Sequence, residues 1–241
     1  AIKLYERLLP DVYRAAVSEA KTLGMKVFTH TPARMTVAEV LALKVDTIEH
    51  MDGYSTAVVP DGFVATQRFP WSEEWANGDP AKFAGLVAMT KEAGTALVPT
   101  IALQNGYQYS ADPETFFARP EMRYLSPTLR DGWRSSIADW LSRFHPYLAR
   151  ERRTKLALVK AMYDGGVPLL IGTDPPNPFV IPGFAIHDEL AGFVEAGIGK
   201  EETLRIATRG AALFLGREKS GIVAPGSAAD LVLVQNDPVA D

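Results

Sequence analysis

The chain has 241 residues, of which 47% are hydrophobic, enough to bury a substantial core in one large domain. The net charge is −4 and there is no concentrated run of Lys or Arg, so a basic nucleic-acid-binding surface is excluded. No apolar run reaches membrane-spanning length, and without cysteine a metal site must use nitrogen and oxygen ligands. We expect neither nucleic acid nor a membrane as a partner, whereas a cytoplasmic or a secreted location stays open.

The first 50 residues alternate between short β-rich runs and segments with helical spacing of apolar residues. This pattern predicts strands at 1–4, 25–29 and 45–49 and helices at 10–21 and 36–44. Gly24 follows the first helix, where a C-terminal glycine is expected. The chain begins at Ala1 rather than Met, and we expect this to reflect processing or a missing front part.

Two of these predicted strands are each followed by a histidine, His30 and His50. Strand, helix and strand form a βαβ unit, whose parallel strands end at the same rim of the sheet. The two imidazoles should therefore lie side by side, as a candidate metal or catalytic site. The alternative is that each histidine caps its strand or bonds a loop carbonyl.

The remainder of the chain continues the alternation with less regular spacing. We predict an irregular aromatic segment at 51–80, helices at 81–93, 148–163, 186–196 and 200–215, strands at 95–103 and 167–173, a lid or specificity insertion at 104–146, and short strands at 220–237. A boundary near Gly216 divides the chain into a barrel portion, 1–216, and a tail of strands, 217–241.

Polar residues end several of the predicted parallel strands, as in a (β/α)8 barrel, which keeps its chemistry at that end. These residues are Lys3, His30, His50 and Asp174. Only five barrel-type strands are predicted, however, whereas a closed barrel needs eight. Either the other strands come from elsewhere, or the sheet is open.

A set of short motifs carries a family resemblance: Ile2-Lys3, Phe28-Thr29-His30, Ile48-Glu49-His50, Gly172-Thr173-Asp174 and the tail from Gly221 to Val232 (GIVAPGSAADLV). In this order they resemble the amidohydrolase superfamily, in its imidazolonepropionase-like and prolidase-like branch. The resemblance implies an α/β fold, a partial (β/α)8 TIM-type barrel containing strands 4 to 8 with a small β-sandwich tail. The HxH motif that ends strand 1 in this family is absent.

The resemblance also implies a set of metal ligands. Lys3 would be the strand 4 lysine, often carboxylated, His30 and His50 the ligands that end strands 5 and 6, and Asp174 the strand 8 aspartate. The cofactor would be one or two divalent ions, most readily zinc, because zinc accepts imidazole nitrogen and carboxylate oxygen. Asp174 would also act as the general base toward a metal-bound water.

These features predict a metal-dependent hydrolase of C–N bonds in amides, dipeptides or cyclic amides. Tyr54, Tyr107 and His187 are candidate substrate-binding residues. A segment supplying strands 1 to 3 and the HxH pair is the expected partner, and open strand edges favour a homo-oligomer. Two alternatives remain: a catalytically incomplete half-barrel that serves as an assembly subunit, and a hydrolase with lactonase-like or phosphotriesterase-like activity.

Overall fold

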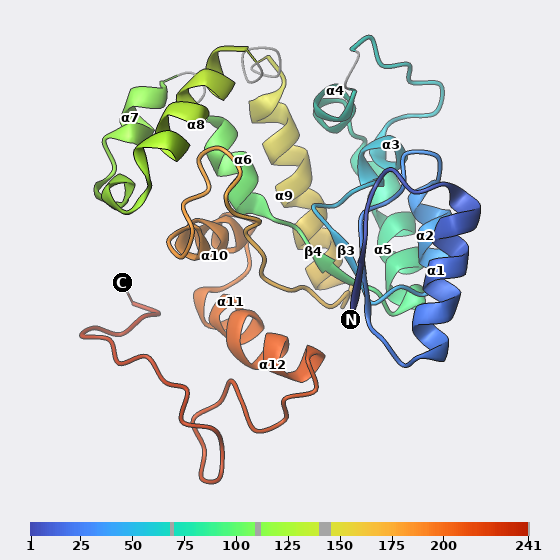
Figure 1. Cartoon of the computed structure of the whole chain (residues 1–241). Coiled ribbons are helices and arrows are strands. Elements are labelled where there is room, and N and C mark those ends of the chain that lie inside the picture. The colour runs from blue at the N-terminus through green and yellow to red at the C-terminus, as the bar shows by residue number, and fades with distance from the viewer. Residues whose placement is uncertain (68–69, 109–111, 140–145, 241) are drawn as a thin grey trace.

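A four-stranded parallel sheet lies at the centre of the computed structural model, which describes residues 1–67, 70–108, 112–139 and 146–240 (Figure 1). The strands lie side by side in chain order: β1 (Ile2–Leu4), β2 (Val27–Thr29), β3 (Thr47–Glu49) and β4 (Ala96–Val98). Parallel neighbours in chain order require a helical crossover between successive strands. The expected α/β architecture, part of a (β/α)8 barrel, is confirmed.

The two faces of the sheet differ in character because side chains alternate along each strand. One face carries Leu4, Thr29, Ile48 and Leu97, all buried, and packs against helices. The Tyr13 hydroxyl on α1 (Pro10–Thr22) lies 2.8 Å from Thr29 Oγ1 on this face. The opposite face, which would line a barrel interior, is mixed: Lys3, Phe28 and Glu49 are at least partly exposed, whereas Thr47, Ala96 and Val98 are buried.

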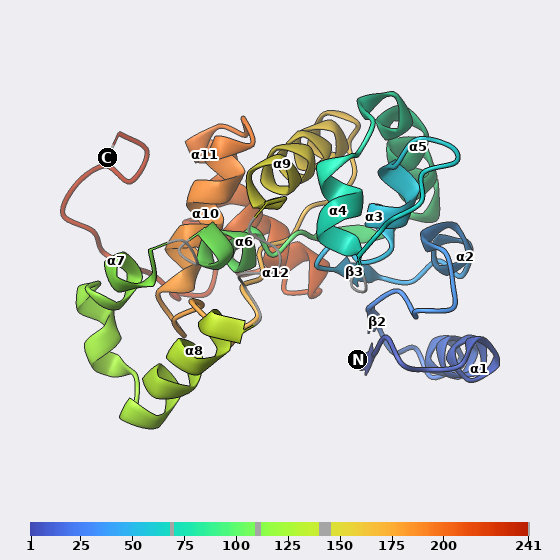
Figure 2. The same ribbon diagram turned by 90° about the horizontal axis from the view of Figure 1, so that it is seen from above.

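Helices α1, α2 (Val37–Ala42) and α5 (Phe83–Ala93) cover the buried face (Figures 1 and 2). Thr36 begins α2 with a capping box, in which its side chain accepts from the Glu39 N–H while the Glu39 carboxylate accepts from the Thr36 N–H. Gly94 ends α5 in the left-handed conformation, with φ 69°. The predicted helices at 10–21, 36–44 and 81–93 are therefore confirmed within a few residues.

Two predicted strands were wrong in extent. The segment 95–103 forms only β4, because helix α6 (Ile101–Gln108) begins shortly after Pro99. The segment 167–173 forms a single parallel bridge between Leu169 and Leu97 rather than a strand. In the part of the chain that the structure describes, this bridge to β4 is the one sheet pairing of the segment.

The predicted insertion at 104–146 contains α7 (Pro113–Phe117), the 3₁₀ helix η2 (Pro120–Tyr124) and α8 (Pro127–Asp139), as well as most of α6. Figures 1 and 2 show α7 and α8 together at one end of the molecule, away from α1 and α2. They share a small hydrophobic core, separate from that of the sheet, with residues of the later loop: Phe116, Met122, Leu125, Trp133, Phe179 and Ile181. The described part of the insertion thus has helices of its own, as predicted.

Several further helices complete the described fold: α3 (Tyr54–Val58), α4 (Trp71–Ala76), the 3₁₀ helix η1 (Pro80–Lys82), α9 (Leu148–Asp164), α10 (Ala185–Glu195), α11 (Lys200–Arg205), the π-helical turn η4 (Ile206–Gly210) and α12 (Ala211–Phe214). The predicted helices at 148–163 and 186–196 are confirmed. The predicted helix at 200–215 is divided by the π-helical turn. No helix among the described residues has the length and apolar character to cross a membrane.

The tail departs from expectation, because none of its described residues, 217–240, lies in a strand. It runs along the outside of the molecule (Figure 1), and the Leu233 side chain is 100% exposed. A strand needs a hydrogen-bonded neighbour, and the described chain places none beside this segment. The division at Gly216 and a β-sandwich built on the tail stay predictions.

Candidate functional site

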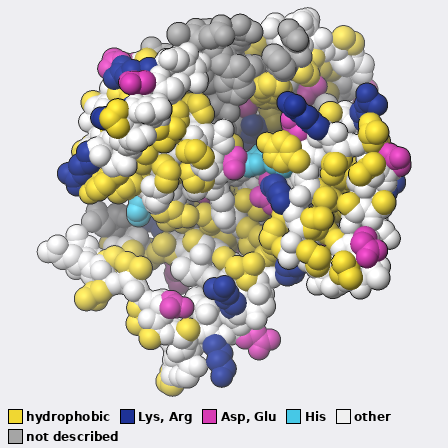
Figure 3. Space-filling view, in the orientation of Figure 1, with side chains coloured by type: hydrophobic (Ala, Val, Ile, Leu, Met, Phe, Trp, Pro, Cys, Tyr) yellow, Lys and Arg dark blue, Asp and Glu magenta, His cyan; other side chains and the backbone are white. Residues whose placement is uncertain are grey.

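The ends of β2 and β3 bring the two histidines together. The His30 N–H donates to Leu4 O at 3.0 Å, and the His50 N–H donates to Val98 O at 2.8 Å, so each backbone continues the parallel ladder. The centroids of the two imidazole rings are 4.7 Å apart. The predicted juxtaposition of His30 and His50 at one rim is present in the structure, inside a hollow where histidine is visible in Figure 3.

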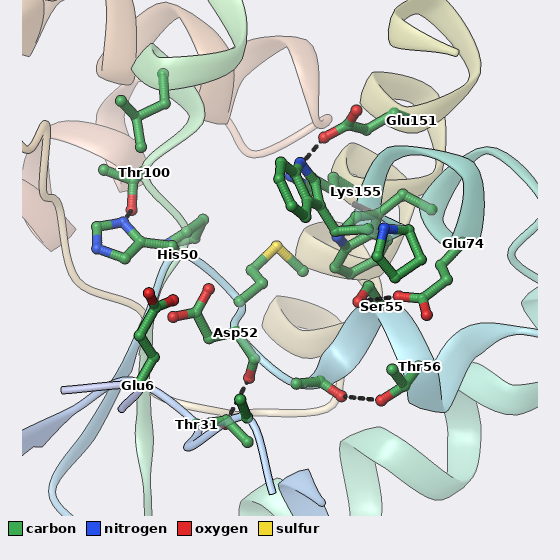
Figure 4. A pocket seen from close by; sticks show the side chains of 18 of the residues that line it. Glu6, Thr31, His50, Asp52, Ser55, Thr56, Glu74, Thr100, Glu151 and Lys155 are labelled. Atoms are coloured by element: carbon green, nitrogen blue, oxygen red, sulfur yellow. Dashed lines mark hydrogen bonds and ion pairs between the residues drawn. The ribbon is translucent and has the colours of Figure 1, made fainter. Parts of the chain in front are cut away.

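Each imidazole has an oxygen partner at Nδ1. His30 Nδ1 pairs with the Asp52 carboxylate. His50 Nδ1 lies 2.7 Å from Thr100 Oγ1, a contact drawn in Figure 4. An oxygen partner at one ring nitrogen fixes the ring orientation and leaves Nε2 for another ligand. Asp52 and Thr100 were not predicted from the sequence. Their positions could have indicated them, because Asp52 lies two residues after His50 and Thr100 two residues after the end of β4.

The electrostatic surroundings keep His50 neutral. Burial lowers its pKa to about 4. The negative charges of Asp52 and Asp174 oppose this shift, and the positive charges of His30 and Lys3 reinforce it. A neutral imidazole carries a proton on one ring nitrogen and a lone pair on the other, and this is the form that binds a metal ion.

Lys3 and Asp174 lie on the same side of the sheet as the two histidines. Lys3 Nζ is 3.9 Å from Glu49 Oε2, and Asp174 Oδ2 is 3.8 Å from His50 Nε2. Asn177 holds Asp174 by donating from Nδ2 to its Oδ2 at 2.9 Å. The structure thus brings Asp174 to the histidine pair, whereas Lys3 is engaged in an ion pair at its edge.

Three residues of this site have left-handed backbones although none is glycine: His50 (φ 58°), Thr100 (φ 53°) and Asp174 (φ 53°). This conformation is uncommon for such residues and costs free energy, so the surrounding structure must impose it. Residues held in this way concentrate at functional sites. The strained backbones therefore support the assignment of this rim as the candidate site.

The donor chemistry fits a divalent metal in part. Two imidazoles and one carboxylate are zinc-type ligands, and in each ring Nδ1 already has an oxygen partner. Among the described residues, however, no group of three or more His, Asp or Glu side chains is arranged to hold an ion. A complete coordination sphere thus needs a further ligand beside His30, His50 and Asp174.

The three predicted substrate-binding residues have different outcomes. Tyr54 is fully buried in the main core, and its hydroxyl lies 2.7 Å from Thr90 Oγ1, so no part of it can touch a substrate. The side chain of Tyr107 lies outside the described residues. His187 is exposed on α10 and does not line the cavity beside the histidine pair.

A buried carboxylate that the sequence analysis missed supports the loop holding Thr100. Glu189 on α10 is fully buried, and its Oε2 accepts the Ala102 N–H at 2.6 Å. Burial raises the pKa of Glu189 to about 8, although backbone N–H groups at Ala102, Ile101 and Thr100 oppose the shift. Only tertiary packing places this side chain at the start of α6.

The geometry agrees with comparisons to known proteins. The sequence matches the profile of the amidohydrolase family over residues 8–241. No curated protein sequence matches it. Among solved structures, a bottromycin amidohydrolase superposes with a TM-score of 0.67 at 25% identity, covering 92% of this chain and 47% of that chain.

Two further structures share the fold. A Xaa-Pro dipeptidase with bound methionine in its active site gives a TM-score of 0.60 at 21% identity and covers 100% of this chain and 50% of its own. The ochratoxinase of A. niger gives 0.60 at 18% identity, with coverages of 100% and 45%. The chain therefore spans about half the length of the solved structures that it matches.

Proposed function

Since the chain belongs to the amidohydrolase family, we propose that it forms the carboxyl-terminal part of a metal-dependent hydrolase that cleaves C–N bonds in amides, dipeptides or cyclic amides. The observation that carries the proposal is the histidine pair, with ring centroids 4.7 Å apart and a separate oxygen partner at each Nδ1. The likeness to a bottromycin amidohydrolase at 25% identity supports the amide class of substrate.

His30, His50 and Asp174 would hold a divalent ion, most readily zinc, and the site would take one or two ions. Lys3 is the candidate for the missing ligand. As a cation it repels a metal, but a lysine that has taken up carbon dioxide is a carboxylate. Its ion pair with Glu49 at 3.9 Å would have to open for that reaction, because the modified side chain carries a negative charge.

When bound, the metal supplies a water of lowered pKa and polarises the scissile carbonyl. The protein provides the proton transfers. Asp174, which is half exposed and beside His50 Nε2, would accept a proton from a water and pass it to the leaving amine. Asp52 and Thr100 keep the two imidazoles in fixed orientations, so that their Nε2 atoms stay available.

We propose that the remaining barrel strands, with an HxH pair, come from a further polypeptide segment. Within the described residues β1 pairs with β2 alone, so its other edge is open. Large apolar side chains are exposed near this edge and along the tail: Tyr5, Leu9, Val12, Val223, Leu231, Val232 and Leu233. Open edges and exposed apolar groups favour association, either with such a segment or with a second copy.

The same open edge favours a second candidate function, that of an assembly subunit without activity of its own. The lack of a three-residue ligand group among the described residues also favours it. The two functions differ in whether this chain by itself retains a metal ion.

The deciding experiment is metal analysis of the purified 241-residue chain after dialysis against zinc, together with its intact mass. We expect about one or two ions per molecule, and substitution of His30 or His50 by alanine should lower zinc affinity by about 10-fold or more. His187→Ala is the matched control, because His187 is an exposed histidine that does not line the cavity beside His50. Zinc affinity that is equal in all variants, or absent, would support the assembly function instead.

A substrate panel then defines the reaction class. Xaa-Pro dipeptides, N-acyl amino acids and cyclic amides test C–N hydrolysis. Lactones and phosphotriesters test the alternative, hydrolysis of these esters by the same metal site. Activity should disappear after chelation and return with added zinc. Turnover of esters or phosphotriesters alone would refute the C–N assignment while leaving the metal site in place.

A further inference from the structure

A cavity of about 430 Å³ extends from His50 toward α4 and α9 (Figure 4). Its near end carries His50, Asp52 and Glu6, and its far end is built by helices. The far-end side chains are Trp71, Glu74, Trp75, Gln104, Glu151 and Lys155. A volume of this size lies within the range of small-molecule binding sites, so the cavity is suited to hold the part of a substrate next to the scissile bond.

The ionisable groups around the cavity are predominantly acidic. Four carboxylates line it, those of Glu6, Asp52, Glu74 and Glu151, against a single lysine, Lys155. The Lys155 ammonium is already paired, since it donates to Glu151 Oε1 at 2.7 Å. The far end therefore retains negative charge after its own ion pair is counted.

Glu74 is the source of that surplus charge. Its side chain is 7% exposed, and the contact it makes is with the Ser55 hydroxyl, which donates to Oε2 at 2.6 Å. Within the described residues no cation lies within ion-pair distance of it. A buried carboxylate with a single neutral donor is incompletely satisfied and favours a cation nearby.

Gln104 gives an independent indication of the ligand. It is 6% exposed at the cavity wall, and its Nε2 donates to Glu151 Oε1 at 3.1 Å. Its Oε1 has no hydrogen-bond partner in the part of the chain that the structure describes. A buried acceptor without a donor lowers stability unless a ligand supplies an N–H group. The unpartnered atom is therefore complementary to a nitrogen donor.

The aromatic wall is suited to the same chemistry. Lys155 Nζ lies 5.3 Å from the centroid of the Trp75 ring, so this indole already faces an ammonium group. Indole rings attract cations through the negative charge of their faces, and the attraction increases when the cation is shielded from water. Trp75 is buried, and Trp71 lines the same cavity.

We propose that this cavity binds a protonated amine or a guanidinium of the substrate, through the Glu74 carboxylate, the Gln104 carbonyl oxygen and the indole wall. The proposal rests on the proposed function in taking the ligand to be the substrate of the neighbouring histidine site. The cation can be the α-amine of a dipeptide or the side chain of a lysine or arginine residue. Both sources present the same N–H donors and positive charge.

The test measures binding to the purified chain in the presence of a chelator, so that neither metal nor turnover is required. Four probes of similar size are titrated by calorimetry: N-acetyl-lysine methylamide, norleucine methylamide, N-acetyl-norleucine methylamide and N-acetyl-glutamate methylamide. The first carries a side-chain ammonium, the second an α-ammonium, the third no charge and the fourth a carboxylate. We expect at least one cationic probe to bind about tenfold more tightly than the neutral probe.

Two variants test the assigned residues. Glu74→Gln should remove most of this preference, and Gln104→Met should weaken cationic binding without changing the charge of the site. Asp61→Asn is the matched control, because this carboxylate is exposed and paired with Lys82. Equal binding of cationic and neutral probes, tighter binding of the anionic probe, or an unchanged preference in both variants would overturn the proposal.

The outcome is separable from that of the proposed function. A cation preference in a chain that neither binds zinc nor hydrolyses amides would retain the cavity assignment and favour the assembly function over hydrolysis by this chain. Zinc-dependent hydrolysis without any cation preference would support the hydrolase and refute the cavity assignment.

Discussion

Replacement of Glu189 by glutamine should change the pH dependence of stability. The carboxyl of Glu189 is fully buried, and burial raises its pKa to about 8 from an ordinary value of 4.5. Because the folded-state pKa is raised, its stabilising contribution is complete below about pH 4.5 and is lost as the pH rises through about 8. Between these values the free energy of unfolding should fall by up to about 1.4 kcal/mol per pH unit.

Glutamine is neutral at every pH and keeps an oxygen for the Ala102 N–H, so the slope due to residue 189 should vanish in Glu189→Gln. Urea unfolding at pH 5, 6.5 and 8, analysed with a common m-value, measures this difference. Glu195→Gln on the same helix is the control. The Arg152 side chain lowers the pKa of Glu195, so its contribution changes only below about pH 4.5. Parallel pH profiles for the wild-type chain and Glu189→Gln would refute the reasoning.

Three further substitutions test the site and the core. Thr100→Val removes the oxygen partner of His50 Nδ1 and should lower zinc affinity about 10- to 100-fold. Competition with a chromogenic chelator measures the affinity, and an unchanged circular dichroism spectrum shows that the variant is folded. Tyr54→Phe removes the hydroxyl contact with Thr90 and should lower the free energy of unfolding in urea by about 1 kcal/mol, while zinc affinity stays the same. A loss of zinc affinity would mean that Tyr54 does contribute to the metal site. Leu97→Ala in the centre of the sheet should cost about 2–5 kcal/mol, and a smaller cost would mean that the core can collapse around the gap.

Local sequence determined the part of the fold that depends on neighbours along the chain. The βαβ unit from β2 to β3 was predictable because its strands are short and β-branched, and because Thr36 and Glu39 mark the start of the helix between them. Since parallel strands share one rim, the meeting of His30 and His50 followed from their positions alone. The candidate site could therefore be located from the sequence.

Contacts between residues that are distant in sequence could not be predicted in this way. Asp52 on the His30 ring, Thr100 on the His50 ring and Glu189 behind the Thr100 loop are fixed by contacts between separate elements. The same limit explains Tyr54, which was expected to reach the substrate from a loop. The structure places it in α3, and its side chain is buried in the core, where the hydroxyl contacts Thr90 on α5.

The sequence by itself determined the order of strands and helices, the rim that carries the histidines and the resemblance to a family, because these depend on local pattern and short motifs. Only the tertiary structure decided that 167–173 contributes one bridge, that the described tail forms no strand, and that an acidic, indole-walled cavity adjoins the site. The physical reason is the same in each case. A strand exists only beside a hydrogen-bonded neighbour, and a cavity only between elements that have packed, so neither is encoded in any one stretch of residues.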